Sequence, residues 1–173
     1  MNQHIKYTDE TDKSFGIAGM AISLVACDAE EMLSAVSLEP DEESFDLANE
    51  LFFISNPRFS AKIAWNELLK QYRIFSAMAL GNLLCRRAAK TADIADEIVE
   101  ELHRMLIDEG CEYCSLEHDE AEMLYDKHSR YYRRLFAHPG VMTIARDFAT
   151  NLRMRRRMTG GEVLEQLARL NSL

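Results

Sequence analysis

The chain has 173 residues, of which 47% are hydrophobic and 28% charged, with 7 glycines, 3 prolines and a formal net charge of −9. A chain of this length can bury a core without disulfides or metal ions, and its composition excludes collagen-like, disordered and disulfide-stapled proteins. Because turn-forming residues are scarce, a few long helices are favoured over many short strands.

Acidic and basic residues are divided unevenly along the chain. Residues 1–126 hold 26 Asp and Glu against 10 Lys and Arg, whereas residues 127–173 hold 3 against 10. A basic segment attracts acidic or polyanionic partners whatever the fold beneath it. We therefore expect a single all-helical domain over 1–173, with an acidic part (1–126) and a basic C-terminal part (127–173).

The cysteines and one uncharged run bear on the compartment. Four cysteines without regular spacing indicate reduced thiols, and hence a cytoplasmic protein. Residues 15–26 carry no charge and end in Leu24-Val-Ala-Cys27, which is similar to a lipoprotein cleavage box. The preceding residues are more acidic than basic, unlike a secretory signal, and twelve residues are too few to span a bilayer. We expect a buried first helix and no contact with a membrane.

Apolar residues recur with helical spacing along most of the chain, which predicts an all-α bundle of six to seven helices. The first helix is expected at about 11–37, buried nearly all round in its first half. Gly16 and Gly19 share one face of it and allow a second helix to approach closely. A second helix is expected at 42–54, and a long central helix, apolar over a wide arc, at about 57–89.

The second half of the chain is expected to add four helices. The first of these has an acidic outer face, which we expect either to face solvent or to receive the basic segment. Capping residues and turn signals place these helices at 91–110, 115–137 and 141–157, with the last one after a capping box formed by Thr159 and Glu162. Thr91 is the expected N-cap and Gly110 the expected C-terminal glycine of the helix at 91–110.

The basic part carries the strongest functional signal. Between residues 127 and 157, nine Lys and Arg face one acid, and eight of the nine are arginine. Arginine binds carboxylates and phosphates through paired hydrogen bonds, and tyrosines beside it can stack on bases. The candidate binding residues are Arg130, Arg133, Arg134, Arg153, Arg155, Arg156, Arg157, Tyr131 and Tyr132.

These features predict a non-catalytic interaction module without a cofactor. Its partner is expected to be an acidic protein surface or a second copy of the chain, bound through an arginine-rich C-terminal surface. Nucleic acid is the alternative partner, although the sequence contains no motif for base readout and the acidic part would repel a long polyanion.

One enzymatic alternative stays open. His118 and Asp119 form an adjacent His-Asp pair, with His103 before it and Asp147 after it. This order resembles the metal-dependent phosphohydrolases of the HD superfamily, which are all-helical. The resemblance implies a divalent ion that these four residues would bind and that would activate water.

A zinc site is a further hypothesis, because Cys111 and Cys114 have the spacing of a ligand pair. The histidines that follow, His118 and His128, lie ten residues apart on one expected helix. That separation places them about 15 Å apart along the helix axis. We therefore expect an uninvolved pair of reduced thiols.

Overall fold

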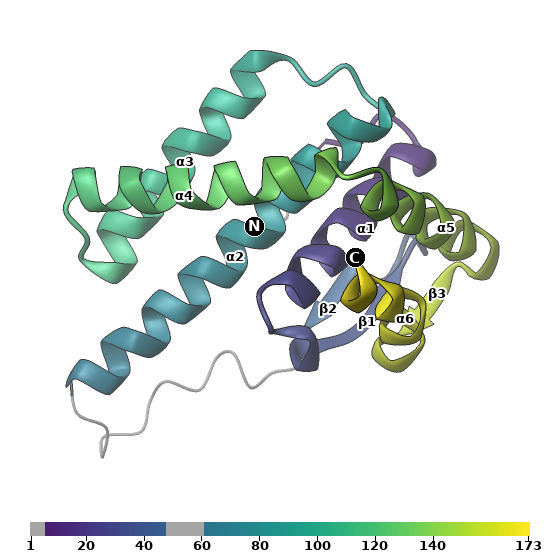
Figure 1. The fold of residues 1–173 in the computed structure, drawn as a ribbon, viewed down its shortest axis with the longest axis horizontal. Coiled ribbons are helices and arrows are strands. Elements are labelled where there is room, and N and C mark those ends of the chain that lie inside the picture. The colour runs from purple at the N-terminus through teal and green to yellow at the C-terminus, as the bar shows by residue number, and fades with distance from the viewer. Residues whose placement is uncertain (1–5, 48–60) are drawn as a thin grey trace.

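The computed structural model describes residues 6–47 and 61–173, and within them the chain is mostly helical, as Figure 1 shows. The predicted all-α bundle is confirmed, and a small sheet is added to it. The described helices are α1 (Glu10–Ala26), α2 (Ala61–Ala89), α3 (Asp96–Cys114), α4 (His118–Ala137), α5 (Pro139–Arg155) and α6 (Gly160–Leu167), and the strands are β1 (Leu33–Ser37), β2 (Phe45–Leu47) and β3 (Arg157–Thr159).

Helix α1 is the most enclosed element. Residues 14–24 are all buried, because α2, α5, α6 and β1 pack around this helix. The uncharged run in the sequence therefore forms the interior of the fold. Among the described residues, no helix is both long and apolar enough to cross a membrane.

The backbones of α1 and α2 touch at two glycines. A Cβ atom on Gly19 would overlap the carbonyl oxygen of Gly81 and lie 2.6 Å from the Cβ of Cys85. A Cβ on Gly81 would overlap the carbonyl oxygen of Gly19 and the hydroxyl of Ser23. The close approach predicted for the glycine face of the first helix is confirmed, and its partner is the long helix α2.

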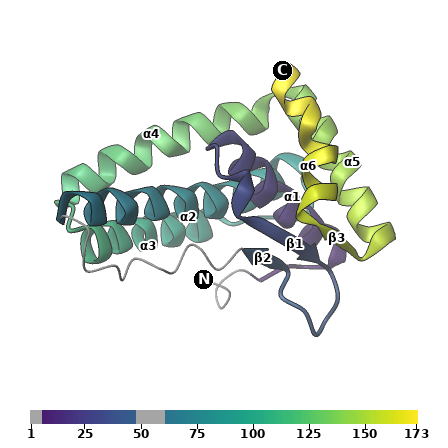
Figure 2. The same ribbon diagram turned by 90° about the horizontal axis from the view of Figure 1, so that it is seen from below.

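Helix α2 packs against α1, α3, α4 and α5, in agreement with its predicted central role, and it ends at Ala89 as expected. The start predicted at residue 57 lies outside the described residues. In Figure 2, α2, α3 and α4 gather on one side of the molecule and α5, α6 and the sheet on the other. One cluster of buried apolar side chains draws residues from α1 through α6 and joins the two sides.

The predicted helix over 11–37 is wrong in its second half. Helix α1 ends at Ala26, and Asp28 adopts a left-handed conformation with φ of 53°. Residues 33–37 then form β1, the central strand of an antiparallel sheet in the order β2-β1-β3. Alanine, leucine and methionine in this segment favour a helix, but pairing with two distant strands overrides that propensity.

The predicted helix at 42–54 is wrong over its described part, because residues 45–47 form β2. Residues 48–54 lie outside the described part of the chain. The predicted cap at Thr91 is also wrong, since the next helix begins at Asp96. The Thr91 hydroxyl instead donates a hydrogen bond to a carboxylate oxygen of Asp12 at 3.0 Å.

Gly110 does not end a helix, contrary to the prediction. Helix α3 continues to Cys114, and Ser115 takes the left-handed position after it, with φ of 52°. A Cβ atom on Gly110 would lie 3.1 Å from the ring of Tyr72 on α2. This glycine therefore serves the packing of α3 against α2.

The remaining helices are confirmed with small changes at their ends. The predicted helix at 115–137 is α4, and that at 141–157 is α5 up to Arg155, since Arg157 begins the unpredicted strand β3. The predicted capping box at the start of α6 is present, with Thr159 and Glu162 bonding to each other's backbone N–H groups.

A buried ion pair ties the first turn of α1 to α2. The guanidinium of Arg86 donates to both carboxylate oxygens of Asp12, at 2.7 and 2.6 Å, and both residues are buried. The backbone N–H of Thr8 and the hydroxyl of Thr91 supply two more hydrogen bonds to the carboxylate, each 3.0 Å long. Every lone pair that burial removes from water therefore has a donor, as a buried charge requires.

The other side of Arg86 is held as closely. One of its nitrogens donates to the carbonyl of Lys6 at 3.0 Å, and another to the side chain of Asn82 at 3.3 Å. The ring of Tyr7 lies 4.9 Å from the guanidinium carbon, and its hydroxyl accepts a bond from Asn82. Residues 6–12 are thus fixed to α2 by one arginine.

The contact between the glycines can be tested with Gly19→Ala. We expect the added methyl group to force α1 and α2 apart and to lower the free energy of unfolding by about 1–3 kcal/mol, measured by urea denaturation. Gly161→Ala is the matched control, because a Cβ there has no neighbour within 4 Å. A Gly19→Ala variant as stable as that control would contradict the close approach.

The ion pair can be tested with Asp12→Asn. Burial alone would raise the pKa of Asp12, but hydrogen bonds from Arg86 and Thr8 outweigh it and hold this pKa below 3.8. The stabilisation is therefore present at neutral pH and is lost as the pH falls through the lowered pKa. We expect Asp12→Asn to lower the free energy of unfolding by about 3–5 kcal/mol at neutral pH, with a smaller effect in strong acid.

Asp96→Asn is the control for that experiment, because it removes an exposed ion pair with Arg87. Its effect should stay below about 1 kcal/mol. Equal effects of the two substitutions would show that the Asp12 pair contributes no more than a surface contact.

Candidate binding surface

Helix α4 separates a buried face from an exposed one. Its buried residues follow each other at helical spacing and pack toward α2, α3 and α5. Figure 2 shows the opposite side of α4 uncovered for most of its length, with the C-terminal turn of the chain rising beside its end. The residues on the buried face are Ala121, Tyr125, Ser129, Tyr132 and Phe136.

The basic residues of α4 lie on its exposed side, in the second half of the helix. Lys127, Arg130 and Arg134 are exposed and have no hydrogen-bond or ion-pair partner among the residues that the structure describes. Arg133 is also exposed, and its Nε donates to the hydroxyl of Ser129 at 3.2 Å on the same helix. None of these four cations is neutralised by a carboxylate within 6–47 or 61–173.

The first half of α4 has the opposite charge. Its acids are exposed, and the N-cap Glu117 and Glu120 form a capping box with each other's backbone. Acids at the start of a helix and cations at its end both suit the helix dipole. The acidic residues of this half are Glu117, Asp119, Glu120, Glu122 and Asp126.

The arginines at the end of α5 and directly after it bond to other side chains within the chain. Arg155 pairs with Glu162 at 2.9 Å, and Arg157 pairs with Glu42 at 3.2 Å. Arg153 donates to the hydroxyl of Thr11 at 3.0 Å. The predicted binding residues therefore fall into two groups, the unneutralised one on α4 and an internally bonded one at 153–157.

Arg156 has the most partners of the second group. Its guanidinium contacts Glu10 at 2.5 Å and Glu39 at 3.1 Å, and it also donates to the carbonyl of Leu38. Its backbone has φ of 68°, a left-handed value uncommon for a residue with a side chain. Arg156 thus joins the end of α5 to α1 and to the residues after β1.

The two tyrosines differ in exposure. Tyr131 is 49% exposed, whereas Tyr132 is buried, and their rings meet edge to face with centroids 5.0 Å apart. Burial raises the pKa of Tyr132, and it also raises the pKa of its hydrogen-bond partner Cys27, to about 11. The prediction that Tyr132 lies on the binding surface is wrong, because its ring belongs to the core, and Tyr131 alone is available.

His128 contributes no positive charge to this surface at neutral pH. Burial, together with the positive charges of the nearby Arg73 and Lys127, lowers its pKa to about 4. Its Nδ1 is buried without a hydrogen-bond partner among the described residues. An uncharged imidazole fits that environment.

The four residues of the HD resemblance do not converge. His103 stacks on the ring of Tyr125, with centroids 4.3 Å apart, and Asp147 pairs with Arg169. His118 and Asp119 lie exposed in the first turn of α4, where His118 is 3.8 Å from Glu122. Within the part of the chain that the structure describes, no three His, Cys, Asp or Glu side chains are grouped to hold a metal ion.

The cysteine pair lies in the last turn of α3. Cys114 is buried, and its thiol donates to the carbonyl of Leu68 at 3.7 Å, while Cys111 is half-buried. Burial raises the pKa of Cys114, which disfavours the thiolate that binds zinc. These contacts are those of a packed helix end, and the pair is not on a loop.

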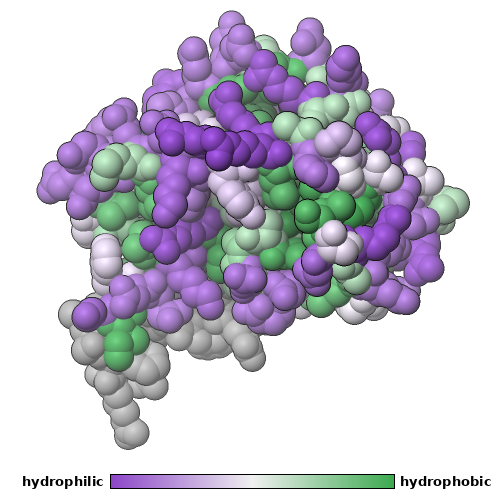
Figure 3. Space-filling model, in the orientation of Figure 1, coloured by the Kyte–Doolittle hydropathy of each residue, from purple (hydrophilic) through white to green (hydrophobic). Residues whose placement is uncertain are grey.

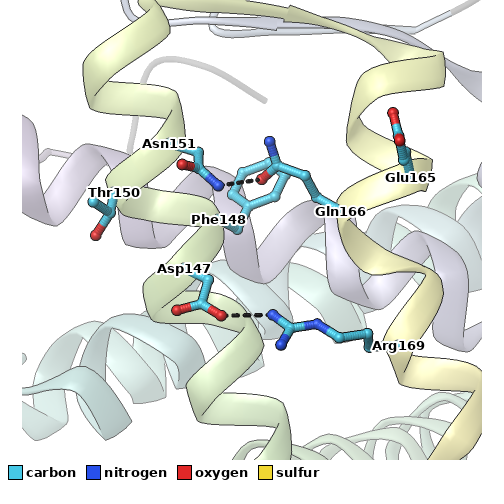
Figure 4. A pocket seen from close by; sticks show the side chains of 7 residues that line it. All are labelled: Asp147, Phe148, Thr150, Asn151, Glu165, Gln166 and Arg169. Carbon is cyan, nitrogen blue, oxygen red and sulfur yellow. Dashed lines mark hydrogen bonds and ion pairs between the residues drawn. The ribbon is translucent and has the colours of Figure 1, made fainter.

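A polar groove of about 430 Å³ lies between α5 and α6 (Figure 4). Its polar groups bond to one another, since Asp147 pairs with Arg169 and Asn151 donates to Gln166 at 3.3 Å. Figure 4 shows Glu165 and Thr150 pointing away from these pairs. The groove is therefore open and polar, but its polar groups largely bond to one another and leave few free to bind a ligand.

Comparisons with family models, with curated proteins and with solved structures give no match to this chain. The candidate surface therefore depends on the geometry described above. Sequence reasoning found the basic half of α4 but gave no role to its acidic half. The signal was present, because the charge changes sign within one predicted helix, between Asp126 and Lys127.

The two groups of arginines can be told apart by charge reversal. Arg156→Glu places a carboxylate beside Glu10 and Glu39, so we expect a lower melting temperature in a thermal denaturation experiment. Arg130→Glu, the same change on α4, should leave the melting temperature nearly unchanged. Equal melting temperatures for the two variants would contradict a structural role for Arg156.

Proposed function

We propose that this protein is a non-catalytic interaction module whose binding surface is the exposed basic half of α4. The observation that carries the proposal is that Lys127, Arg130, Arg133 and Arg134 are all exposed and have no carboxylate partner in the described part of the chain. Arginines at 155–157, by contrast, are already neutralised from within.

An acidic protein surface suits these cations. A guanidinium can hold a carboxylate through two parallel hydrogen bonds, and a cluster of like charges speeds and orients the approach of an oppositely charged partner. Because the surface is one half of one helix, the acidic partner site need be no longer than two or three helical turns.

Two further features support this proposal over the alternatives. Five exposed acids on the first half of α4 would repel a long polyanion laid along the helix, which disfavours nucleic acid. All four cysteines are free thiols, which agrees with a protein of the reducing cytoplasm.

The proposal predicts that Arg130→Glu/Arg133→Glu/Arg134→Glu abolishes binding to an acidic polypeptide. Immobilised poly-L-glutamate of about ten residues, short enough to lie on the basic half of α4 alone, serves as the probe. Wild-type protein should be retained on it and released by added salt. Lys62→Glu/Lys70→Glu/Arg104→Glu makes the same change of charge at exposed sites on α2 and α3, so it controls for net charge.

Loss of retention in the α4 variant, with retention in the control, is the expected result. A wild type that does not bind poly-L-glutamate or dimerise would overturn the proposal. Stronger retention on a single-stranded oligonucleotide, with a steep salt dependence that the α4 variant loses, would replace the acidic protein with nucleic acid as the partner.

A further inference from the structure

We propose that the acidic surface recognised by α4 is the first half of α4 in a second copy of this chain, so that two copies pair through antiparallel α4 helices. This inference rests on the proposed function and names its partner. The order of charges along α4, the exposure of its outer face and the apolar residues on that face support this pairing.

The outer face of α4 carries residues at alternating spacings of three and four, which places them in one stripe along the helix. All of them are exposed, as is Asp119 beside the stripe. The stripe lies on the side opposite the buried residues, where Figure 2 shows no covering element over most of its length. Its members are Glu120, Met123, Lys127, Arg130 and Arg134.

Charge order along the stripe selects an antiparallel partner. If a second α4 lies antiparallel, Asp119 and Glu120 of each copy come opposite Arg130 and Arg134 of the other. A parallel partner would place acids opposite acids and cations opposite cations, which is repulsive along the whole contact. A twofold axis near the middle of the helix satisfies both ends at once, as an interface between identical surfaces requires.

The same face exposes apolar residues that an interface can cover. Met123 is 69% exposed and Tyr131 is 49% exposed, one in each half of the helix. Methionine and tyrosine are among the residue types enriched at protein interfaces. Figure 3 shows that this side of the molecule is largely hydrophilic, with hydrophobic residues gathered right of centre and a smaller group at the left.

The size of the contact predicts a weak dimer. The 20 residues of α4 extend over about 30 Å, so a single pair of helices lies at the small end of specific interfaces. Because ion pairs supply its specificity, the dimer should dissociate as salt rises from about 0.1 M to about 1 M, where the Debye length falls from about 10 Å to about 3 Å.

The test is a charge exchange measured by sedimentation equilibrium of the full chain. The basic-end variant is Arg130→Glu/Arg134→Glu, and the acidic-end variant is Asp119→Arg/Glu120→Arg. Each variant alone opposes like charges at both ends of the antiparallel pair, so its dissociation constant should rise about tenfold or more, equivalent to about 1.4 kcal/mol or more.

Mixing the two variants should restore dimers, since the contacts at both ends of the mixed pair then join opposite charges. A chain carrying all four substitutions should dimerise for the same reason. Asp119→Asn/Glu120→Gln, whose side chains can still accept hydrogen bonds at the helix start, should weaken the dimer without unfolding it. Circular dichroism of each variant separates loss of dimers from loss of structure.

The outcomes distinguish this inference from the proposed function. A wild type that stays monomeric at low salt and still binds poly-L-glutamate would overturn the pairing of α4 helices and leave the proposed function intact. Folded variants whose mixture fails to restore dimers would overturn the antiparallel arrangement. A wild type that neither dimerises nor binds would overturn both.

Discussion

The contact between the backbones of α1 and α2 determines where the other elements can lie. Because Gly19 and Gly81 leave no room for a side chain between the two helices, they form one unit with α1 enclosed. Helices α5 and α6 and the sheet cover the rest of α1, whereas α3 and α4 pack on α2. Helix α4 consequently lies at the periphery, which gives it an outer face.

Position in the fold decides what each basic residue does. The arginines at 155–157 lie at the end of α5 and directly after it, where acids from the start of α1, after β1 and within α6 come within reach. The cations of α4 lie on a helix whose outer side no described element covers, so they have no carboxylate partner. Four of the ten cations in the C-terminal part, Arg155, Arg156, Arg157 and Arg169, are therefore paired with carboxylates inside the chain. Four of the others lie together on α4 and are left for a partner.

The elements that could be predicted are those that are determined by residues close to one another in the sequence. Long apolar periodicity located α2, α4 and α5, the capping box located α6, and two glycines predicted a helix contact. Non-local contacts could not be predicted, because β1 has five residues with no alternation of burial and pairs with β3 from the far end of the chain. The separation of the arginines into two groups could not be predicted for the same reason, since the acids that neutralise Arg156 and Arg157 lie far away in sequence.

Arg86 holds the chain segment before α1 from inside the fold. The carbonyl of Lys6, the ring of Tyr7 and the N–H of Thr8 all bond to it or to its carboxylate partner. Cleavage of the peptide by a protease just after Thr8 would free these groups and admit water to the Arg86 side chain, which the intact protein keeps 7% exposed. Proteolytic removal of this segment would therefore destabilise the packing of α1 against α2 in the interior of the molecule.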